Sequence, residues 1–283
     1  MRLEKKKMSV RKKILIVWLS VIAVLVTAIV IVGLPSGAKH ETVGEAMLDG
    51  VLHETNKVSF FGMEVNPAVI SAYTVTAILL VIALLIRVIA LPKFKTVPGK
   101  FQSAVEVVVE FFSGLARKNS PHRPGFVGAY IFSVGVYIFF STVFELFGIQ
   151  AVTTKGHSIS LPAPIADING AIATGVLSFL VILTAGFVFG GLKGGLGVLK
   201  DFSLPISMSF RLFGALLSGL LVTELVYYYT ALSFVLPVVV GVMFTLLHAL
   251  IQTYVLTTLV SIFYGEAAEP KPKKIKPKKD EKK

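Results

Sequence analysis

The sequence predicts an all-α, polytopic membrane protein with about six membrane helices. Composition is the first observation: 54% of the 283 residues are hydrophobic and only 16% are charged, against about 25% charged in soluble domains. The second is that several apolar stretches exceed the roughly 20 residues needed to cross a bilayer. The chain also contains no cysteine, which says nothing about the fold but excludes disulfides and thiolate metal sites. We expect no metal and no cofactor.

Six membrane spans are expected, at residues 14–34, 70–90, 126–149, 168–190, 203–230 and 232–263. The last two ranges are longer than a perpendicular crossing needs, which predicts strong tilt or segments lying partly along the membrane. The first range follows a basic stretch and resembles a signal peptide, but its apolar part is longer than the roughly 7–15 residues of such peptides. A retained anchor is therefore favoured over a cleaved signal peptide.

Positive charge is concentrated at the two ends of the chain. Residues 1–13 hold seven Lys/Arg against one Glu, and residues 266–283 hold eight Lys against four acids. Basic clusters beside membrane spans are typical of cytoplasmic ends, so both tails are predicted inside, together with the lysines of 91–100 and 190–201. The Pro/Lys-rich tail 266–283 is predicted to be disordered. No aromatic residues interleave with these basic clusters, which argues against nucleic-acid binding.

The connecting segments are predicted from their residue patterns. Residues 35–69 mix polar and apolar residues without a period and are expected to form an external loop, as are 150–165. Polar residues spaced by four along 101–118 predict an amphipathic helix on the inner surface. The glycine-rich segment GGLKGGLG (190–197) lacks the GK[ST] ending of a phosphate loop, so a flexible inside turn is expected. Just before it, Gly186 and Gly190 predict a helix-packing contact.

Arg211, in the stretch SFRLFGALLSG, is a permanent cation inside an apolar span. An unpaired arginine at membrane depth costs several kcal/mol, so it is expected to face protein or water. Helical spacing places a stripe of small residues on its face: Ser207, Gly214, Ala215, Ser218 and Gly219. Another helix can approach such a stripe closely. The counter-charge belongs either to an acid in the same bundle or, as we favour, to a carboxylate on a different subunit.

Other polar residues lie at different depths in the predicted spans. Four of them lie toward the outer ends of their spans: Glu145, Asp167, Asn169 and Glu224. His248 and Gln252 share one face of the last helix at i,i+4 spacing. Together these residues are consistent with a cation-attracting aqueous path from outside to near mid-membrane. For each residue alone, a satisfied interhelical hydrogen bond is the alternative. Ser203, Ser207 and Ser209 suggest a second, inner path, although such serines often bond only their own backbone.

The motif SMSFRLFGALLSG resembles the arginine helix of subunit a of the F-type ATP synthases. Three further stretches resemble that family in the same order: the segment leading to KTVPGKFQSAVEVVVEFF, the helix ADINGAIATGVLSFLVI, and the final helix HALIQTYVLTTLVSIFYGEA. The resemblance covers roughly residues 60–269. It identifies 70–265 as an ion-translocating membrane domain, and it implies that the last two helices pack as a hairpin against a ring of c subunits.

The resemblance also implies roles for particular residues. Arg211 matches the essential arginine, Gln252 the glutamine opposite it, and Asp167 with Asn169 the polar pair of the family's ADxN motif. An ion would enter one half-channel, bind a carboxylate on a c subunit, ride the ring and leave by the other half-channel. The implied partners are the c-subunit ring, the b-subunit peripheral stalk, the remainder of the complex and membrane lipid. The implied location is the bacterial plasma membrane.

The sequence departs from the family pattern at several outer positions. Ala215 and Leu220 stand where many bacterial relatives have Asn and an acidic residue, and Glu224 lies one turn beyond Leu220 on the same face. Glu145 stands where Asn is common. Thr245 stands where the family often has a histidine, seven residues before the glutamine, and His248 lies nearby instead. Two other classes of function would leave different patterns in the sequence. A stand-alone transporter or channel should show repeats or its own paired ionisable groups, and an intramembrane enzyme should show a nucleophile or metal motif; neither pattern is evident.

Overall fold

The computed structural model describes residues 20, 58–60, 63–152, 154, 158–228 and 236–269. By contacts the chain divides into two units, residues 1–52 with 220–241, and residues 53–219 with 242–283. Nearly all of the described residues belong to the second unit, which holds the features below. Apart from Ser20, the predicted basic tail 1–13 and first span 14–34 lie outside the described residues, as does the predicted tail beyond Glu269.

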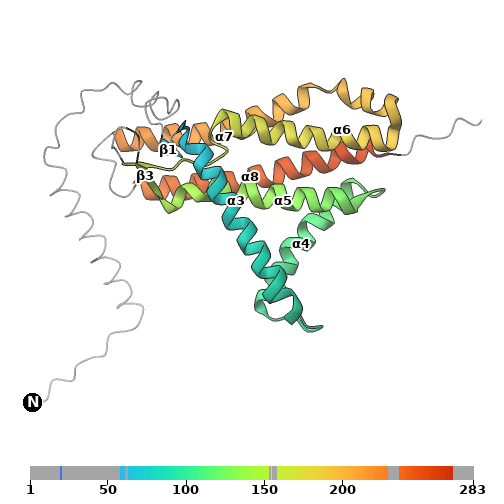
Figure 1. Cartoon of the computed structure of the whole chain (residues 1–283), viewed down its shortest axis with the longest axis horizontal. Helices are drawn as coiled ribbons and strands as arrows, with labels where there is room; N and C mark the ends of the chain where they lie inside the picture. The colour runs from blue at the N-terminus through green and yellow to red at the C-terminus, as the bar shows by residue number, and fades with distance from the viewer. Residues whose placement is uncertain are drawn as a thin grey trace, which may run out of the picture. The chain divides into compact units, whose positions relative to one another are not determined.

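The prediction of an all-α membrane protein is confirmed. The long helices are α3 (Pro67–Leu85), α4 (Lys100–Asn119), α5 (Pro124–Phe144), α6 (Ile168–Leu199), α7 (Ser203–Tyr228) and α8 (Leu236–Ala267) (Figure 1). Within the described residues, four helical stretches are long and apolar enough to cross a membrane: Pro67–Lys93, Pro124–Phe147, Ile168–Leu199 and Val238–Ala267. They cover the predicted spans 70–90, 126–149 and 168–190 and most of 232–263. The helix predicted over 101–118 is α4.

The two segments predicted as outer loops contain short hairpins. Strand β1 (Val58–Phe60) pairs antiparallel with β2 (Met63–Val65), and β3 (Gln150–Val152) pairs antiparallel with β4 (Ser158–Ser160). The predicted loop 35–69 also ends too late, because α3 already begins at Pro67. Asn66 caps this helix, its Oδ1 accepting from the Ala68 amide at 2.9 Å, and Pro67 has the fixed φ that suits a first helical position.

The glycine-rich segment contains a turn, as predicted, but the turn is confined to Gly191 and the residues on either side are helical. Helix α6 continues to Leu199 with one break, at Gly191 (φ 60°, ψ −160°), where only glycine is unstrained. There the chain reverses and the next two turns pack back on the helix, since a Cβ on Gly186 would meet Val198 at 2.8 Å and the Gly194 carbonyl at 3.1 Å. Figure 1 shows this return beside α6. The contact predicted for Gly186 is thus confirmed, whereas Gly190 faces open space.

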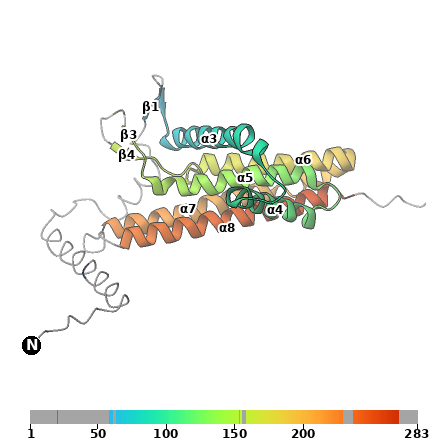
Figure 2. The ribbon, with the colours of Figure 1, turned by 90° about the horizontal axis from the view of Figure 1, so that it is seen from below.

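Helix α8 supplies one side of the core. Its buried residues recur at helical spacing, as Leu256, Val260 and Tyr264 do, and pack on residues of α4 and α5 such as Ile131. Two side-chain bonds fix this packing: Asn119 Nδ2 donates to Ser261 Oγ at 2.8 Å, and Thr253 Oγ1 donates to the Gly135 carbonyl at 3.4 Å. Figures 1 and 2 show α8 beside α5.

Helices α6 and α7 cross very closely at Gly175. A Cβ on this residue would clash with Ser209 Oγ and would approach the Pro205 carbonyl at 3.0 Å. Ser209 itself is buried and donates to the Pro205 carbonyl at 2.7 Å. The Ser209 hydroxyl therefore bonds the backbone of its own helix and does not line an inner path, which is the alternative that the sequence analysis gives for these serines.

Candidate functional site

Arg211 lies on the exposed face of α7. The opposite side of the helix is buried through Met208, Ser209 and Leu212. Small exposed residues, Ser207, Gly214 and Ser218, lie before and after the arginine at helical spacings of three and four. The large apolar residues Ile206 and Phe210 beside it are also exposed. Ala215 and Gly219 flank this line of small residues and are half-buried. Three residues of the predicted small stripe thus lie with the arginine on the exposed side of α7.

No carboxylate pairs with the Arg211 guanidinium among the side chains that the structure describes. Open space also surrounds Gly214, one turn further along, where an added Cβ would meet nothing within 4 Å. The side chain of Glu224, the acid predicted to lie further along α7, is outside the described part. The guanidinium is thus a permanent charge on an accessible surface bordered by very small side chains.

Gln252 of α8 is level with Arg211, as the family resemblance implies. Its side chain is 5% exposed, and Nε2 donates to the Arg211 backbone carbonyl at 3.3 Å. The other amide atom, Oε1, is buried and has no hydrogen-bond partner in the described structure. Gln252 therefore contacts the arginine through the backbone and leaves the guanidinium free to face outward.

His248 lies one turn before Gln252 and faces α7 on the same side of α8. A Cβ built on Gly219 would lie 3.9 Å from His248 Nδ1, so the imidazole fills the space beside this glycine. The same nitrogen is 2.8 Å from the Phe244 carbonyl, and the ring stacks on Phe244 with centroids 5.9 Å apart. The pairings of Arg211 with Gln252 and of Gly219 with His248 run in opposite chain directions. They confirm that α7 and α8 pack antiparallel here.

Asp167 and Asn169 form a second group at the start of α6. Asp167 is the N-cap of this helix, and its Oδ1 accepts from the Asn169 amide at 2.8 Å. Its Oδ2 accepts from Asn66 Nδ2 at 2.7 Å, which ties the starts of α3 and α6 together. The sequence analysis missed Asn66, although the pattern Asn-Pro before an apolar run is a helix-start signal. Both carboxylate oxygens of Asp167 thus have structural partners.

Glu145 is half-buried at the C-terminal end of α5. It opens a short helical turn, Glu145–Phe147, which Gly148 closes in the left-handed conformation. This end of α5 leads into β3 and then to the start of α6, where Asp167 lies. In the described residues no hydrogen bond joins the Asp167 pair to the group formed by Arg211, Gln252 and His248.

Arg211 lies about 12 Å along α7 from its first residue, Ser203. The chain returns alongside α6 before α7 begins, and Ser209 meets Gly175, which is about 22 Å along α6 from Gly190. Helix α8 agrees, because Gln252 is also about 22 Å from Ala267 at its end.

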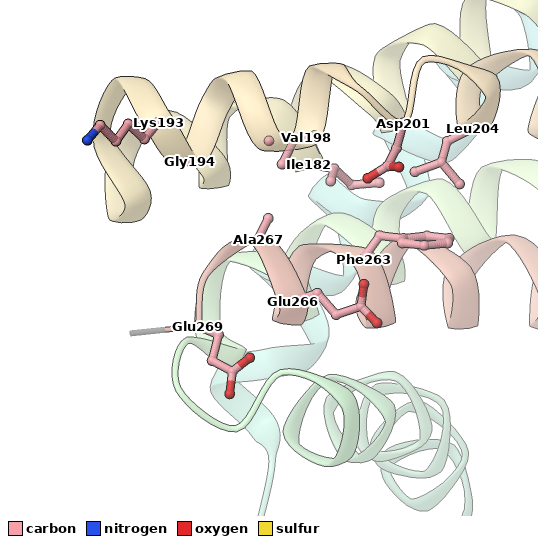
Figure 3. A pocket seen from close by; sticks show the side chains of 11 residues that line it. Ile182, Lys193, Gly194, Val198, Asp201, Leu204, Phe263, Glu266, Ala267 and Glu269 are labelled. Carbon is pink, nitrogen blue, oxygen red and sulfur yellow. The ribbon is translucent and has the colours of Figure 1, made fainter. Parts of the chain in front are cut away.

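A cavity of about 380 Å³ opens between the returning segment of α6, the start of α7 and the end of α8 (Figure 3). Four charged residues line it: Lys193, Asp201, Glu266 and Glu269. Ile182, Leu204 and Phe263 form part of its apolar wall. No group of three or more potential metal ligands occurs in the described residues. The sequence analysis did not identify this cavity, because the reversal at Gly191 that forms one wall was expected to be a flexible turn.

The chain was compared with known families. A family model described as ATP synthase A chain matches residues 71–265. The matched range begins in α3 and ends in the last turn of α8. It includes Arg211, Gln252, His248 and the Asp167 pair, and most of the cavity lining.

Proposed function

Because this chain belongs to the ATP synthase A chain family, we propose that it is the stationary subunit of the membrane sector that couples ion flow to rotation of a ring of c subunits. In this proposal the exposed line of α7 faces the ring, and Arg211 meets the carboxylate that each c subunit presents. The chain has no catalytic site of its own. ATP is made or hydrolysed elsewhere in the complex.

The observation that carries the proposal is the exposed guanidinium on a face of small residues. Burying a permanent cation in lipid without a partner costs several kcal/mol, so this charge requires water or an external anion. Gly214 and Ser218 allow a neighbouring helix to come close enough to supply that anion. The close crossing of α6 and α7 at Gly175 holds the arginine at a fixed depth.

Two ion paths are part of the proposal. The outer path would involve His248, Glu224, Glu145 and the Asp167–Asn169 pair, of which Glu145 directly follows α5 and Asp167 caps the start of α6. The inner path would start at the cavity lined by Asp201, Glu266 and Glu269, whose carboxylates attract cations. Arg211 lies between the two regions in depth.

Arg211 would have two tasks at the meeting point of these paths. As a c-subunit carboxylate arrives, the guanidinium favours its ionised form and so promotes release of the bound ion. The same charge repels a cation that would pass directly from one path to the other. Each charge that leaks is worth about 2.3 kcal/mol per 100 mV, so a direct leak would waste the energy that drives rotation.

The remaining assignments follow from the same proposal. The c-subunit ring, the b-subunit peripheral stalk and the remainder of the complex would be the protein partners. The chain would lie in a bacterial plasma membrane with both termini in the cytoplasm, since the basic tails favour that side.

ATP-driven ion pumping by vesicles that contain the whole complex tests this function. We expect Arg211→Ala to abolish pumping while the complex still assembles, and to raise the passive ion leak. Arg87→Ala is the matched control, because Arg87 is also an exposed arginine in a membrane helix but lies far from α7 in sequence. Pumping that survives in Arg211→Ala would show that the arginine is only a packing or topology device. Failure of the c subunit to co-purify with the chain would instead favour a stand-alone transporter.

A further inference from the structure

The chain has a basic concavity where its first described membrane span ends. The span Pro67–Lys93 passes through a π-helical turn, Ile86–Ala90, and a short 3-10 turn, Leu91–Lys93. The following residues lead directly into α4, which begins at Lys100. Figure 1 shows the end of α3 and the start of α4 meeting at this point. Because the span ends here, this segment lies at the level of the membrane interface.

Three lysines surround the concavity, and no acidic residue lines it. The cavity measures about 560 Å³, and Lys93, Lys95 and Lys100 are part of its lining. All three lysines are exposed. Three ammonium groups around one hollow repel one another unless an anion lies between them.

The loop that carries these lysines is held in one conformation. Gln102 Oε1 accepts from the Lys95 amide at 3.0 Å, and Gln102 Nε2 donates to the Lys95 carbonyl at 2.8 Å. The same Nε2 donates to Glu106 Oε1 at 2.8 Å, so the nearest acid of α4 is engaged with the glutamine. The Phe94 amide also bonds the Leu91 carbonyl at 3.2 Å. The hollow is therefore built by the fold and does not depend on the lysine side chains alone.

Large apolar side chains stand exposed beside the lysines. Val97 is 83% exposed, Phe101 58% and Ile89 52%, and all three line the same cavity. Apolar side chains next to ammonium groups suit the boundary between headgroups and acyl chains. A free phosphate would use the lysines and leave these apolar residues in water, whereas a phospholipid covers both.

We propose that this concavity binds the phosphate headgroup of an anionic phospholipid, with Val97 and Phe101 against the upper part of its acyl chains. The site is separate from the ion path and does not depend on the proposed function. Its occupant would fix the end of α3 and the start of α4 at the membrane surface.

Fluorescence quenching at the site itself tests the proposal. The chain has no cysteine, so Ala104→Cys, an exposed position one turn into α4, gives a single dye position on this subunit. The labelled complex is placed in phosphatidylcholine vesicles that contain nitroxide-labelled phosphatidylglycerol or, in parallel, nitroxide-labelled phosphatidylcholine. We expect preferential quenching by phosphatidylglycerol. Since each lysine near anionic headgroups contributes about fivefold, replacing Lys93, Lys95 and Lys100 by Gln should reduce that preference by about tenfold or more.

Two variants distinguish a binding site preformed by the fold from general attraction of anionic lipid by surface charge. Replacing Arg117, Lys118 and Lys200 by Gln removes the same charge from exposed positions outside the cavity, and it should leave the preference unchanged. Gln102→Ala keeps every lysine but removes both bonds to the Lys95 backbone, and it should lower the preference. An equal loss in the control, or full preference in Gln102→Ala, would show diffuse attraction and overturn the proposal. Equal quenching by the two lipids in the labelled Ala104→Cys complex, with the lysines and Gln102 unchanged, would also overturn it.

Discussion

Only one of the two polar atoms in the Gln252 side-chain amide has a hydrogen-bond partner among the described residues. Nε2 contacts the Arg211 carbonyl, while the buried Oε1 has no partner among the described residues. A buried polar atom without a partner costs about 1–3 kcal/mol. The residue is therefore poorly explained by stability alone, and its place beside Arg211 indicates that its neutral polarity matters to the arginine.

The charge at position 252 provides a direct test. Gln252→Glu replaces the amide that donates to the Arg211 carbonyl by a carboxylate, which removes that hydrogen bond and brings a negative charge close to the arginine of the same chain. We expect ATP-driven pumping to fall by about tenfold or more, because the arginine then competes less well for the carboxylate of the ring. Gln252→Met keeps a similar size without a charge and should retain more pumping. Equal pumping by the two variants would contradict this account.

Asp167 has a structural task that can be separated from a role in ion transport. Because it caps α6 and accepts from Asn66, Asp167→Ala should lower the free energy of unfolding by about 1–2 kcal/mol. Asp167→Asn keeps an acceptor for the Asn169 amide, so we expect most of that stability to remain. Thermal unfolding of the solubilised complex measures the first effect, and pumping by the Asn variant measures any need for the charge. A fully stable Asp167→Ala would show that the cap is unimportant.

At the scale of the helices, the structure adds a close crossing that the sequence does not reveal. Gly175 is one of several glycines in an apolar run, and nothing in its local pattern distinguishes it from Gly190. Only the fold brings Ser209 and Pro205 against it. The contact between α6 and α7 is what holds the arginine helix at its depth.

A larger side chain at position 175 should therefore displace Arg211 although it does not contact the arginine. Gly175→Ala places a methyl group against Ser209 and the Pro205 backbone, and overpacking of this kind costs about 1–3 kcal/mol. We expect a lower unfolding temperature and reduced pumping. The matched control is Gly114→Ala in α4, where an added Cβ meets nothing within 4 Å and better helix propensity gives a slight gain. A neutral Gly175→Ala would mean that α7 shifts easily relative to α6.

The sequence predicts the helices far better than their connections. Apolar runs in α3, α5 and α6 are long, so spans 70–90, 126–149 and 168–190 follow from composition alone. The pairing of Arg211 with Gln252 follows from the resemblance, and in the structure the contact between them is a hydrogen bond to the Arg211 backbone carbonyl. The glycine-rich segment predicts a turn but not the helical residues on either side of Gly191, because such a segment has low helix propensity.

At the scale of the larger unit, contacts between distant segments define its two ends. At one end, the start of α5 meets the end of α6 through Arg123, whose guanidinium lies 5.1 Å from the Phe189 ring. The start of α5 also meets the end of α8, since the rings of Phe126 and Tyr264 are 6.2 Å apart. At the other end, Asn66 joins the starts of α3 and α6. The helices therefore alternate in direction, as the predicted topology requires.

Cross-linking can test this arrangement in the native membrane. The side chains of Asn119 and Ser261 are in hydrogen-bond contact although 142 residues separate them in sequence. Cysteines at both positions should form a disulfide on mild oxidation, and no native cysteine of this chain can interfere. The pair Gly114→Cys with Ser261→Cys is the control, because an added Cβ on Gly114 meets nothing within 4 Å. A higher yield in the control pair would refute the packing of α4 on α8.

The length of the segment between Gly191 and Ser203 determines which residue of α8 lies opposite Arg211 of α7. Helix α8 reaches its end without a comparable detour, so Gln252 is located by its own distance from Ala267, whereas Arg211 is located by the length of the returning segment. One extra helical turn in that segment would move Arg211 by about 5.4 Å relative to Gln252. The number of residues in this stretch is therefore more constrained than their identity, and insertions or deletions there should be tolerated less well than substitutions.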